Sequence, residues 1–385
     1  MPTFPHSITS KLPDVGTTIF TIMSGLANET GAINLSQGFP NFPASEKLIS
    51  LVQEQMKKGF NQYAPMQGIM PLREILCEKA SMLYGALYAP DSEITITSGG
   101  TQALYTAIAA IIRKGDEVII IEPAYDSYIP AIEMHGGIVK SAQVKSPDFK
   151  INWNQVRSLL SSRTKMIMIN TPHNPTGSVM SAADMEELQR ITADTEIIIV
   201  SDEVYEHIIF DDLRHESVMR YPKLAERSFV IFSFGKTYHT TGWKLGYCFA
   251  PANLMVEFRK VHQFNVFSAN TPIQYALAEY IRNSNDYMDL PTFFQEKRDF
   301  FINAVRESRF TLKPASGSYF QLLDYSNITD EIDTDFAIRM TREFKVASIP
   351  VSVFYSKPPD QKVLRFCFAK TNETLEMAGE KLCKI

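Results

Sequence analysis

The chain has 385 residues, of which 45% are hydrophobic and 21% charged, a composition typical of a globular protein of about two domains. A formal net charge of −5 and a pI near 5.9 argue against non-specific nucleic-acid binding, which needs a basic face. The four cysteines form no CxxC pair and the seven histidines form no HExxH motif, so we expect neither a disulfide framework nor a metal site. The amino-terminal segment contains prolines instead of a signal-peptide core, and no apolar run reaches the roughly 18 residues of a membrane span. We therefore expect a cytoplasmic protein.

Short apolar segments alternate with helical stretches through the middle of the chain. The sequence predicts a buried helix over 101–115 and strands over 93–100, 116–125, 165–177, 196–205 and 228–236. Near-continuous Ile and Val runs, without alternation, are typical of strands that are buried on both faces of a parallel sheet. The strand–helix–strand order predicts a three-layer α/β domain with right-handed crossovers.

The pattern changes after about residue 285. An amphipathic helix is expected over 293–308, and strands are expected over 317–325 and 362–370. The first 45 residues are rich in loop-forming residues, and we expect them to pack against the C-terminal part. The predicted fold is α/β, with a three-layer large domain and mostly parallel sheet over 46–285. A smaller α+β domain is predicted from 1–45 and 286–385.

Several chemically capable residues fall at predicted strand ends, which is where open α/β sheets bind ligands. Gly99, Gly100, Thr101 and Gln102 form a strand-to-helix turn. Glycines there let the backbone approach a phosphate, and the helix start offers free N–H groups and a positive dipole end. A simple tight turn would have the same sequence. Asn174, in HNPTG, could donate to a phenolate oxygen on a bound ring, or the segment could only close a loop.

Charged residues lie at three other predicted strand ends. Asp202 follows the apolar run EIIIV, where an acid is costly to bury unless it meets a cation or donors; it could instead cap a helix. Lys236 ends an apolar strand, and a semi-buried lysine is the side chain that forms imines with aldehydes. Ser233 and Lys244 flank it with a hydroxyl and a cation that suit a phosphate. Arg365, in LRFCFAK, is either a salt-bridged structural residue or a bidentate binder of a carboxylate.

In their order and spacing these motifs resemble class I aminotransferases of the aspartate-aminotransferase fold, over nearly the whole chain. The motifs are SQGFP (36–40), NQYAPMQG (61–68), SGGTQAL (98–104), EPAYDSY (122–128), NTPHNPTG (170–177), SDEVYE (201–206), SFGKTYHTTGWKLGY (233–247) and LRFCFAK (364–370). Within that family the chain is most similar to methionine aminotransferases and to the kynurenine/glutamine aminotransferases. SKLPDVGTTIF, NQYAP, FGKTYHTTGWK and LRFCFAK carry this narrower resemblance.

The resemblance implies pyridoxal 5'-phosphate as the cofactor, bound to Lys236 as a Schiff base, with the same lysine moving the substrate proton. Asp202 would pair with the pyridine nitrogen and keep it protonated. Tyr205 and Asn174 would bond the phenolate oxygen, and Tyr125 would stack on the ring. The phosphate would be held by small and polar residues, namely Gly100, Thr101, Gln102, Ser233 and Lys244, with Tyr63 from the other subunit of a homodimer. Arg365 would bind the substrate α-carboxylate, helped by Asn174 and the backbone of Gly38.

Lys244 and Gln102 depart from the family pattern. Lys244 stands where many aspartate-type members have arginine, so the phosphate would be held by a point charge instead of a planar fork. Gln102 replaces the small residue that commonly follows the threonine of the phosphate turn, and its role stays open.

The activity that the resemblance implies is ping-pong transamination from methionine or an aromatic amino acid to a 2-oxo acid. No second arginine for a side-chain carboxylate could be identified, which disfavours aspartate as the donor. An alternative is a kynurenine/glutamine-type enzyme with cysteine-conjugate β-lyase activity. A second alternative is a regulator built on an aminotransferase-like domain, but such proteins usually carry a basic helix-turn-helix, for which we expect no room here. Amino acids and 2-oxo acids are the expected partners, with neither nucleic acid nor membrane.

Overall fold

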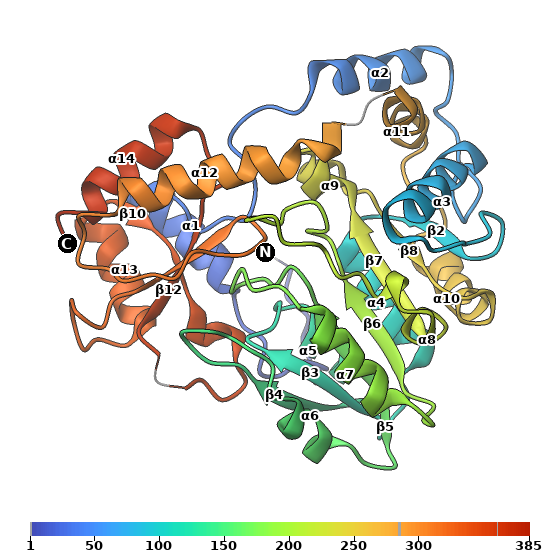
Figure 1. Cartoon of the computed structure of the whole chain (residues 1–385), viewed down its shortest axis with the longest axis horizontal. Helices are drawn as coiled ribbons and strands as arrows, with labels where there is room; N and C mark the ends of the chain where they lie inside the picture. Colours follow the sequence, from blue (N-terminus) through green and yellow to red (C-terminus); the bar gives the residue numbers. More distant parts are fainter. Residues whose placement is uncertain (1, 284–285, 360) are drawn as a thin grey trace.

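The computed structural model of the chain describes residues 2–283, 286–359 and 361–385, so the boundary predicted at residue 285 lies outside the described residues. Its larger part is built on a seven-stranded sheet of order β2-β8-β7-β6-β5-β3-β4 (Figure 1). The strands are β2 (Ile94–Thr97), β3 (Glu117–Glu122), β4 (Ile138–Gln143), β5 (Thr164–Asn170), β6 (Ile198–Asp202), β7 (Ser228–Ser233) and β8 (Gly246–Phe249). Only β8 runs antiparallel to its neighbours β2 and β7, so the sheet is mostly parallel.

Helices cover both faces of this sheet (Figure 1), and alternate strand residues point to opposite helix layers. In β3, Val118 and Ile120 pack in one cluster with α4 (Gly100–Ile111), α5 (Tyr128–Met134) and α10 (Ala252–Asn265). Ile119 and Ile121 pack in the other, with α3 (Met70–Tyr84), α6 (Trp153–Leu159), α7 (Ala182–Thr192) and α11 (Thr271–Asn283). Continuous apolar runs form these strands because both faces of each strand are buried.

The smaller part is α+β. It contains the antiparallel sheet β11-β12-β9. Its elements are α12 (Leu290–Ala304), β9 (Phe320–Asp324), α13 (Asp333–Glu343), β10 (Val346–Ala347), β11 (Ile349–Pro350), β12 (Val363–Cys367) and α14 (Asn372–Leu382). The remaining elements are α2 (Glu46–Lys57), α8 (Pro222–Ala225), α9 (Phe234–Thr237), η1 (Val218–Arg220), η2 (Thr241–Trp243), η3 (Asp286–Met288) and η4 (Val351–Phe354).

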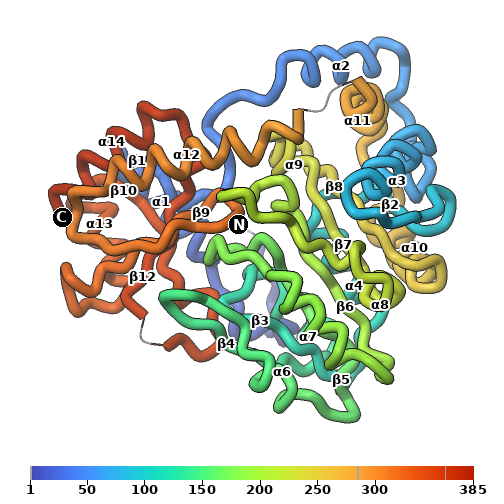
Figure 2. Tube along the Cα trace, viewed as in Figure 1, coloured from blue at the N-terminus to red at the C-terminus, as the bar shows by residue number. Residues whose placement is uncertain are grey.

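The N-terminal segment packs against this C-terminal part. Strand β1 (Ile33–Asn34) pairs in parallel with β10, and Figure 2 shows the blue N-terminal trace running among the orange and red C-terminal elements. The segment is not only loop, because it includes the helix α1 (Ile19–Thr30). The N-terminal segment is thereby joined to the C-terminal elements by backbone pairing. Within the described ranges, no helix has the length and apolar character needed to cross a membrane.

Candidate active site

A cavity of about 310 Å³ lies at the carboxyl ends of β5, β6 and β7, between the large sheet and the smaller part. Most of the residues predicted for the site line it: Gly38, Gly100, Thr101, Tyr125, Asn174, Asp202, Tyr205, Ser233, Lys236, Lys244 and Arg365. Phe20 of α1 and Phe320 of β9, which the sequence did not single out, complete an aromatic side of the wall. The fold therefore collects residues from both ends and the middle of the chain around one space.

Lys236 lies in α9, a short turn that follows β7, and not at the end of the strand itself. Its Nζ donates hydrogen bonds to the carbonyl of Gly38 at 3.1 Å and to the hydroxyl of Tyr319 at 2.8 Å. Burial lowers the pKa of Lys236 to about 8, and the nearby Arg365 acts in the same direction. About a tenth of the amine is thus uncharged at neutral pH, which suits a group that must accept a proton.

Asp202 is the last residue of β6 and is buried. Its Oδ2 accepts a hydrogen bond from the hydroxyl of Tyr128 at 2.5 Å, and its Oδ1 accepts one from the backbone N–H of Val204 at 3.3 Å. The chain continues beyond it in a turn, so the helix-cap interpretation of this acid is wrong. Burial raises the pKa of Asp202 to about 6, against the effect of the Tyr128 hydrogen bond. A buried acid of this kind is stabilised by any cation that reaches it.

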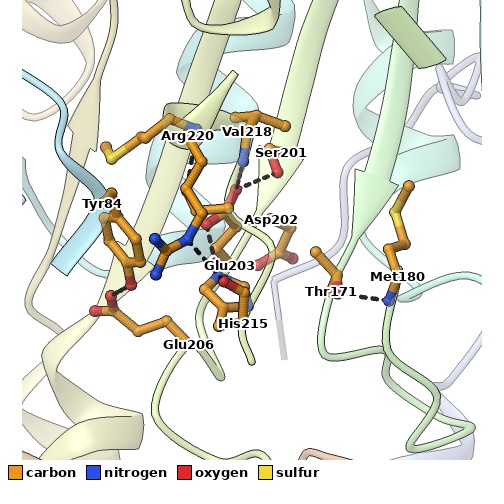
Figure 3. Close-up of polar contacts among 12 residues, drawn as sticks. Tyr84, Thr171, Met180, Ser201, Asp202, Glu203, Glu206, His215, Val218 and Arg220 are labelled. Atoms are coloured by element: carbon orange, nitrogen blue, oxygen red, sulfur yellow. Dashed lines mark hydrogen bonds and ion pairs between the residues drawn. The ribbon is translucent and has the colours of Figure 1, made fainter. Parts of the chain in front are cut away.

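The segment that follows Asp202 is held by two buried acids, as Figure 3 shows. Glu203 accepts hydrogen bonds from the Ser201 hydroxyl at 2.7 Å and from the backbone N–H of Val218 at 3.1 Å, and its carboxylate lies 2.8 Å from His215 Nε2. Glu206 pairs with Lys79 of α3 at 2.6 Å. Because both acids are satisfied, the short loop between them is fixed, and Tyr205 is fixed with it.

The start of α4 forms one end of the cavity. Gly99 has a φ of +84°, a conformation that favours glycine, and a Cβ there would lie 3.5 Å from Lys244 Nζ. Thr101 Oγ1 lies 3.4 Å from the Tyr125 hydroxyl, and Ser233 ends the neighbouring strand β7. Free backbone N–H groups at the start of a helix, hydroxyls and a cation together suit a phosphate.

Gln102 and Tyr63 do not belong to the described wall of this cavity. The Gln102 side chain accepts a hydrogen bond from the backbone N–H of Ser98 at 3.0 Å and lies 3.2 Å from Nδ1 of His262. It therefore stabilises the turn before α4 from outside the cavity. Tyr63 is 81% exposed, and its ring contacts Phe267 at a centroid distance of 5.2 Å. Tyr63 therefore lies at the surface and outside the described wall of the cavity of its own chain.

Arg365 lies in β12 and is fully buried. Its Nη1 donates to Asn174 Oδ1 at 2.7 Å and its Nη2 to the carbonyl of Ser36 at 2.8 Å, so these partners are uncharged. Its Nε is buried with no hydrogen-bond partner among the described residues, and the guanidinium lies 4.0 Å from the ring centroid of Phe320. Burial lowers the pKa of Arg365 to about 10. A buried cation with a spare donor and neutral partners is suited to a carboxylate ligand.

Comparison with known proteins identifies the family. The sequence pattern of the family described as "Aminotransferase class I and II" matches residues 30–382. The chain belongs to the class I and II aminotransferase family. The protein named methionine aminotransferase in Escherichia coli (strain K12) is 50% identical to this aminotransferase over 374 residues, which are 97% of either chain. Human kynurenine–oxoglutarate transaminase 1 is 34% identical and covers 93% of each chain.

A solved structure gives the same result for the fold. The crystal structure of YbdL from Escherichia coli, described as identifying a methionine aminotransferase function, matches this aminotransferase with a TM-score of 0.96 and 48% identity. The match covers 99% of this chain and 100% of the other. The predicted resemblance to class I aminotransferases and the predicted α/β fold with a mostly parallel large sheet are confirmed.

Proposed function

We propose that this aminotransferase moves the amino group of methionine or an aromatic amino acid to a 2-oxo acid, with pyridoxal 5'-phosphate as its cofactor. The observation that carries the proposal is the convergence of three groups on one cavity. A buried amine at Lys236, a buried acid at Asp202 and a buried guanidinium at Arg365 line the same space. The 50% identity to a protein named methionine aminotransferase supports methionine as a donor.

The residues of the cavity fit this cofactor at each of its polar groups. The start of α4, with Thr101, Ser233 and Lys244, would hold the phosphate. Asp202 would keep the ring nitrogen protonated, since a cation there removes the cost of its burial. Lys236 would hold the cofactor covalently through its amine. When bound, pyridoxal phosphate supplies a conjugated ring that draws electron density from the substrate Cα.

On the same proposal, Gly100 and the backbone of Gln102 would join the phosphate site, and Tyr125 would stack on the ring. Asn174 and Tyr205 would bond the phenolate oxygen. Asn174 would then have two tasks, because its Oδ1 also accepts from Arg365 and so orients the guanidinium.

The other proposed roles concern the part of the cavity that would bind the substrate. Arg365 would bind the α-carboxylate, with the backbone of Gly38 close by, and thereby direct the Cα–H bond toward Lys236. The uncharged amine of Lys236 would take that proton and later return it. The other cations in the described wall of the cavity are Lys236 and Lys244, which already have roles. The aromatic side formed by Phe20 and Phe320 therefore favours apolar amino-acid side chains over a second carboxylate.

We also propose that the protein is a cytoplasmic homodimer in which Tyr63 reaches the phosphate of the partner chain. Its 81% exposure in the single chain supports this role. The division into a large domain, 46–285, and a small domain of 1–45 and 286–385 is part of the same proposal, supported by the pairing of β1 with β10.

The test is a half-reaction screen. The holoenzyme is mixed with methionine, phenylalanine, kynurenine or aspartate, and the change in the visible absorption of the cofactor is followed over time. We expect fast conversion with methionine and phenylalanine and slow conversion with aspartate, and a preference for aspartate would contradict the proposal. Pyruvate and ammonia released from a cysteine conjugate without any 2-oxo acid would favour the β-lyase alternative.

A further inference from the structure

Tyr319 contacts Lys236 from the turn before β9, and none of the roles described above uses it. Its side chain is fully buried. The hydroxyl oxygen is 2.8 Å from Lys236 Nζ, and the hydroxyl proton is donated to the carbonyl of Gly38. The same carbonyl lies 3.1 Å from Lys236 Nζ. Tyrosine, glycine carbonyl and lysine amine therefore form a closed triangle of hydrogen bonds.

We propose that Tyr319 is a positioning residue for Lys236: with the carbonyl of Gly38 it binds both N–H bonds of the uncharged amine and leaves the lone pair directed at the substrate. This inference rests on the proposed function, in which Lys236 removes the Cα proton. An uncharged primary amine has two N–H bonds and one lone pair. Because Tyr319 donates its own proton to the carbonyl of Gly38, its oxygen faces the amine as an acceptor. Neither the Tyr319 contact nor the Gly38 contact then occupies the lone pair of the Lys236 amine.

Packing fixes the position of the Tyr319 hydroxyl. Its ring contacts those of Tyr205 and Phe320 at centroid distances of 5.0 Å each, and its backbone carbonyl accepts from Phe368 N–H at 3.0 Å. Gly38 approaches so closely that a Cβ there would lie 2.8 Å from Phe320 Cζ. Lysine has a flexible four-carbon stem, so rigid acceptors of this kind are what limit where its amine can point.

Tyr319 also acts on the charge of the amine. The other titratable groups that face Lys236 are Asp202 of β6, Arg365 and Cys367 of β12, Lys244 after η2, and Tyr205. A hydrogen bond from the charged amine to a neutral oxygen stabilises the charged form. The Tyr319 contact therefore opposes the burial that lowers the pKa of Lys236, and its removal should lower that pKa further.

Tyr319→Phe removes the oxygen and keeps the ring, so the packing that holds this turn is retained. A matched control is Tyr355→Phe. The hydroxyl of Tyr355 has the same pattern, since it accepts from Gln361 Nε2 at 2.9 Å and donates to the carbonyl of Val144 at 2.7 Å. That tyrosine is buried as well, but it is not bonded to Lys236.

Two measurements test the inference. The first uses the apoenzyme: an amine-reactive reagent is applied over a range of pH, and mass mapping of the peptide that contains Lys236 gives the pKa of its amine. The second uses the holoenzyme. Comparison of ordinary methionine with methionine deuterated at Cα in a single turnover gives the rate of proton removal, and steady-state assays give kcat and KM separately.

We expect Tyr319→Phe to lower the pKa of Lys236 by roughly one unit and to slow proton removal by about 10- to 100-fold, with little change in KM. Tyr355→Phe should change neither quantity. An unchanged Lys236 pKa in Tyr319→Phe, or an equal change in both variants, would overturn the inference. The apoenzyme measurement does not depend on the substrate, so it separates a failure of this inference from a failure of the proposed function.

Discussion

Replacement of Asp202 with asparagine should have opposite effects on the apoenzyme and on cofactor binding. The carboxylate is buried at the end of β6, and burial raises its pKa from 3.8 to about 6. In the apoenzyme the ionised acid therefore destabilises the fold. With the cofactor bound, the protonated ring nitrogen would pair with the same charge. The asparagine side chain would be neutral with or without the cofactor. The variant would therefore lose both the destabilisation of the apoenzyme and the ion pair with the ring nitrogen.

The size of the apoenzyme effect follows from linkage. The difference between 3.8 and about 6 corresponds to roughly 3 kcal/mol of lost stability when the acid is ionised. Because the folded-state pKa is the higher one, the loss is absent below pH 3.8, grows as pH rises toward 6 and is complete above it. The asparagine oxygen can still accept from the Tyr128 hydroxyl, but the asparagine NH2 would then face the backbone N–H of Val204, and that long hydrogen bond of 3.3 Å would be lost. The Asp202→Asn apoenzyme should be more stable than the wild type by up to about 3 kcal/mol near neutral pH.

Urea unfolding of both apoenzymes, at about pH 8 and again at about pH 4, measures this difference. We expect the variant to gain stability at the higher pH and to match the wild type at the lower pH. Cofactor titration of the same samples should show weaker binding by the variant. A variant that is less stable than the wild type by the same amount at both pH values would refute the reasoning, because the effect would then be one of packing and not of charge.

Three further substitutions test other contacts. Lys236→Ala should fold and retain cofactor noncovalently but lose nearly all transamination with methionine; turnover at the wild-type rate would exclude Lys236 as the base. Arg365→Lys should raise the KM for methionine by about 10- to 100-fold in steady-state assays, because a point charge would replace the planar fork that donates to Asn174 and, on the proposed function, would bind the substrate carboxylate; an unchanged KM would show that the carboxylate does not bind to Arg365. Tyr128→Phe should raise the pKa of Asp202 further, because its hydroxyl stabilises the ionised carboxylate; apoenzyme stability that responds to pH as the wild type does would contradict this.

The sequence predicts best those strands whose apolar composition matches their burial in the fold. Strands β3, β5, β6 and β7 are continuous apolar runs because helices cover both of their faces. Strand β4, IVKSAQ, was not predicted, since it is an edge strand whose residues are mostly half-buried. Lys236 was expected at a strand end but lies in α9, where a Cβ at position 235 would lie only 2.9 Å from Thr241 Cα, so the turn needs Gly235.

The site residues that sequence reasoning left open or missed depend on contacts between distant segments. The sequence does not tell whether Arg365 pairs with an acid, because its partners, Asn174 and Ser36, come from distant segments of the chain. Tyr128 and Tyr319 look like ordinary packing tyrosines in sequence, because nothing local tells where a hydroxyl will point. Their proximity to Asp202 and Lys236 comes only from the packing of separate elements.

On the proposed function, Lys236 is the amine to which the cofactor is attached. Reduction of the holoenzyme with sodium borohydride makes such an attachment permanent, and digestion followed by mass spectrometry locates it. We expect the added pyridoxyl mass on the peptide that contains Lys236. The same mass on a peptide with another lysine of the cavity, such as Lys244, or on no peptide at all, would contradict the assignment.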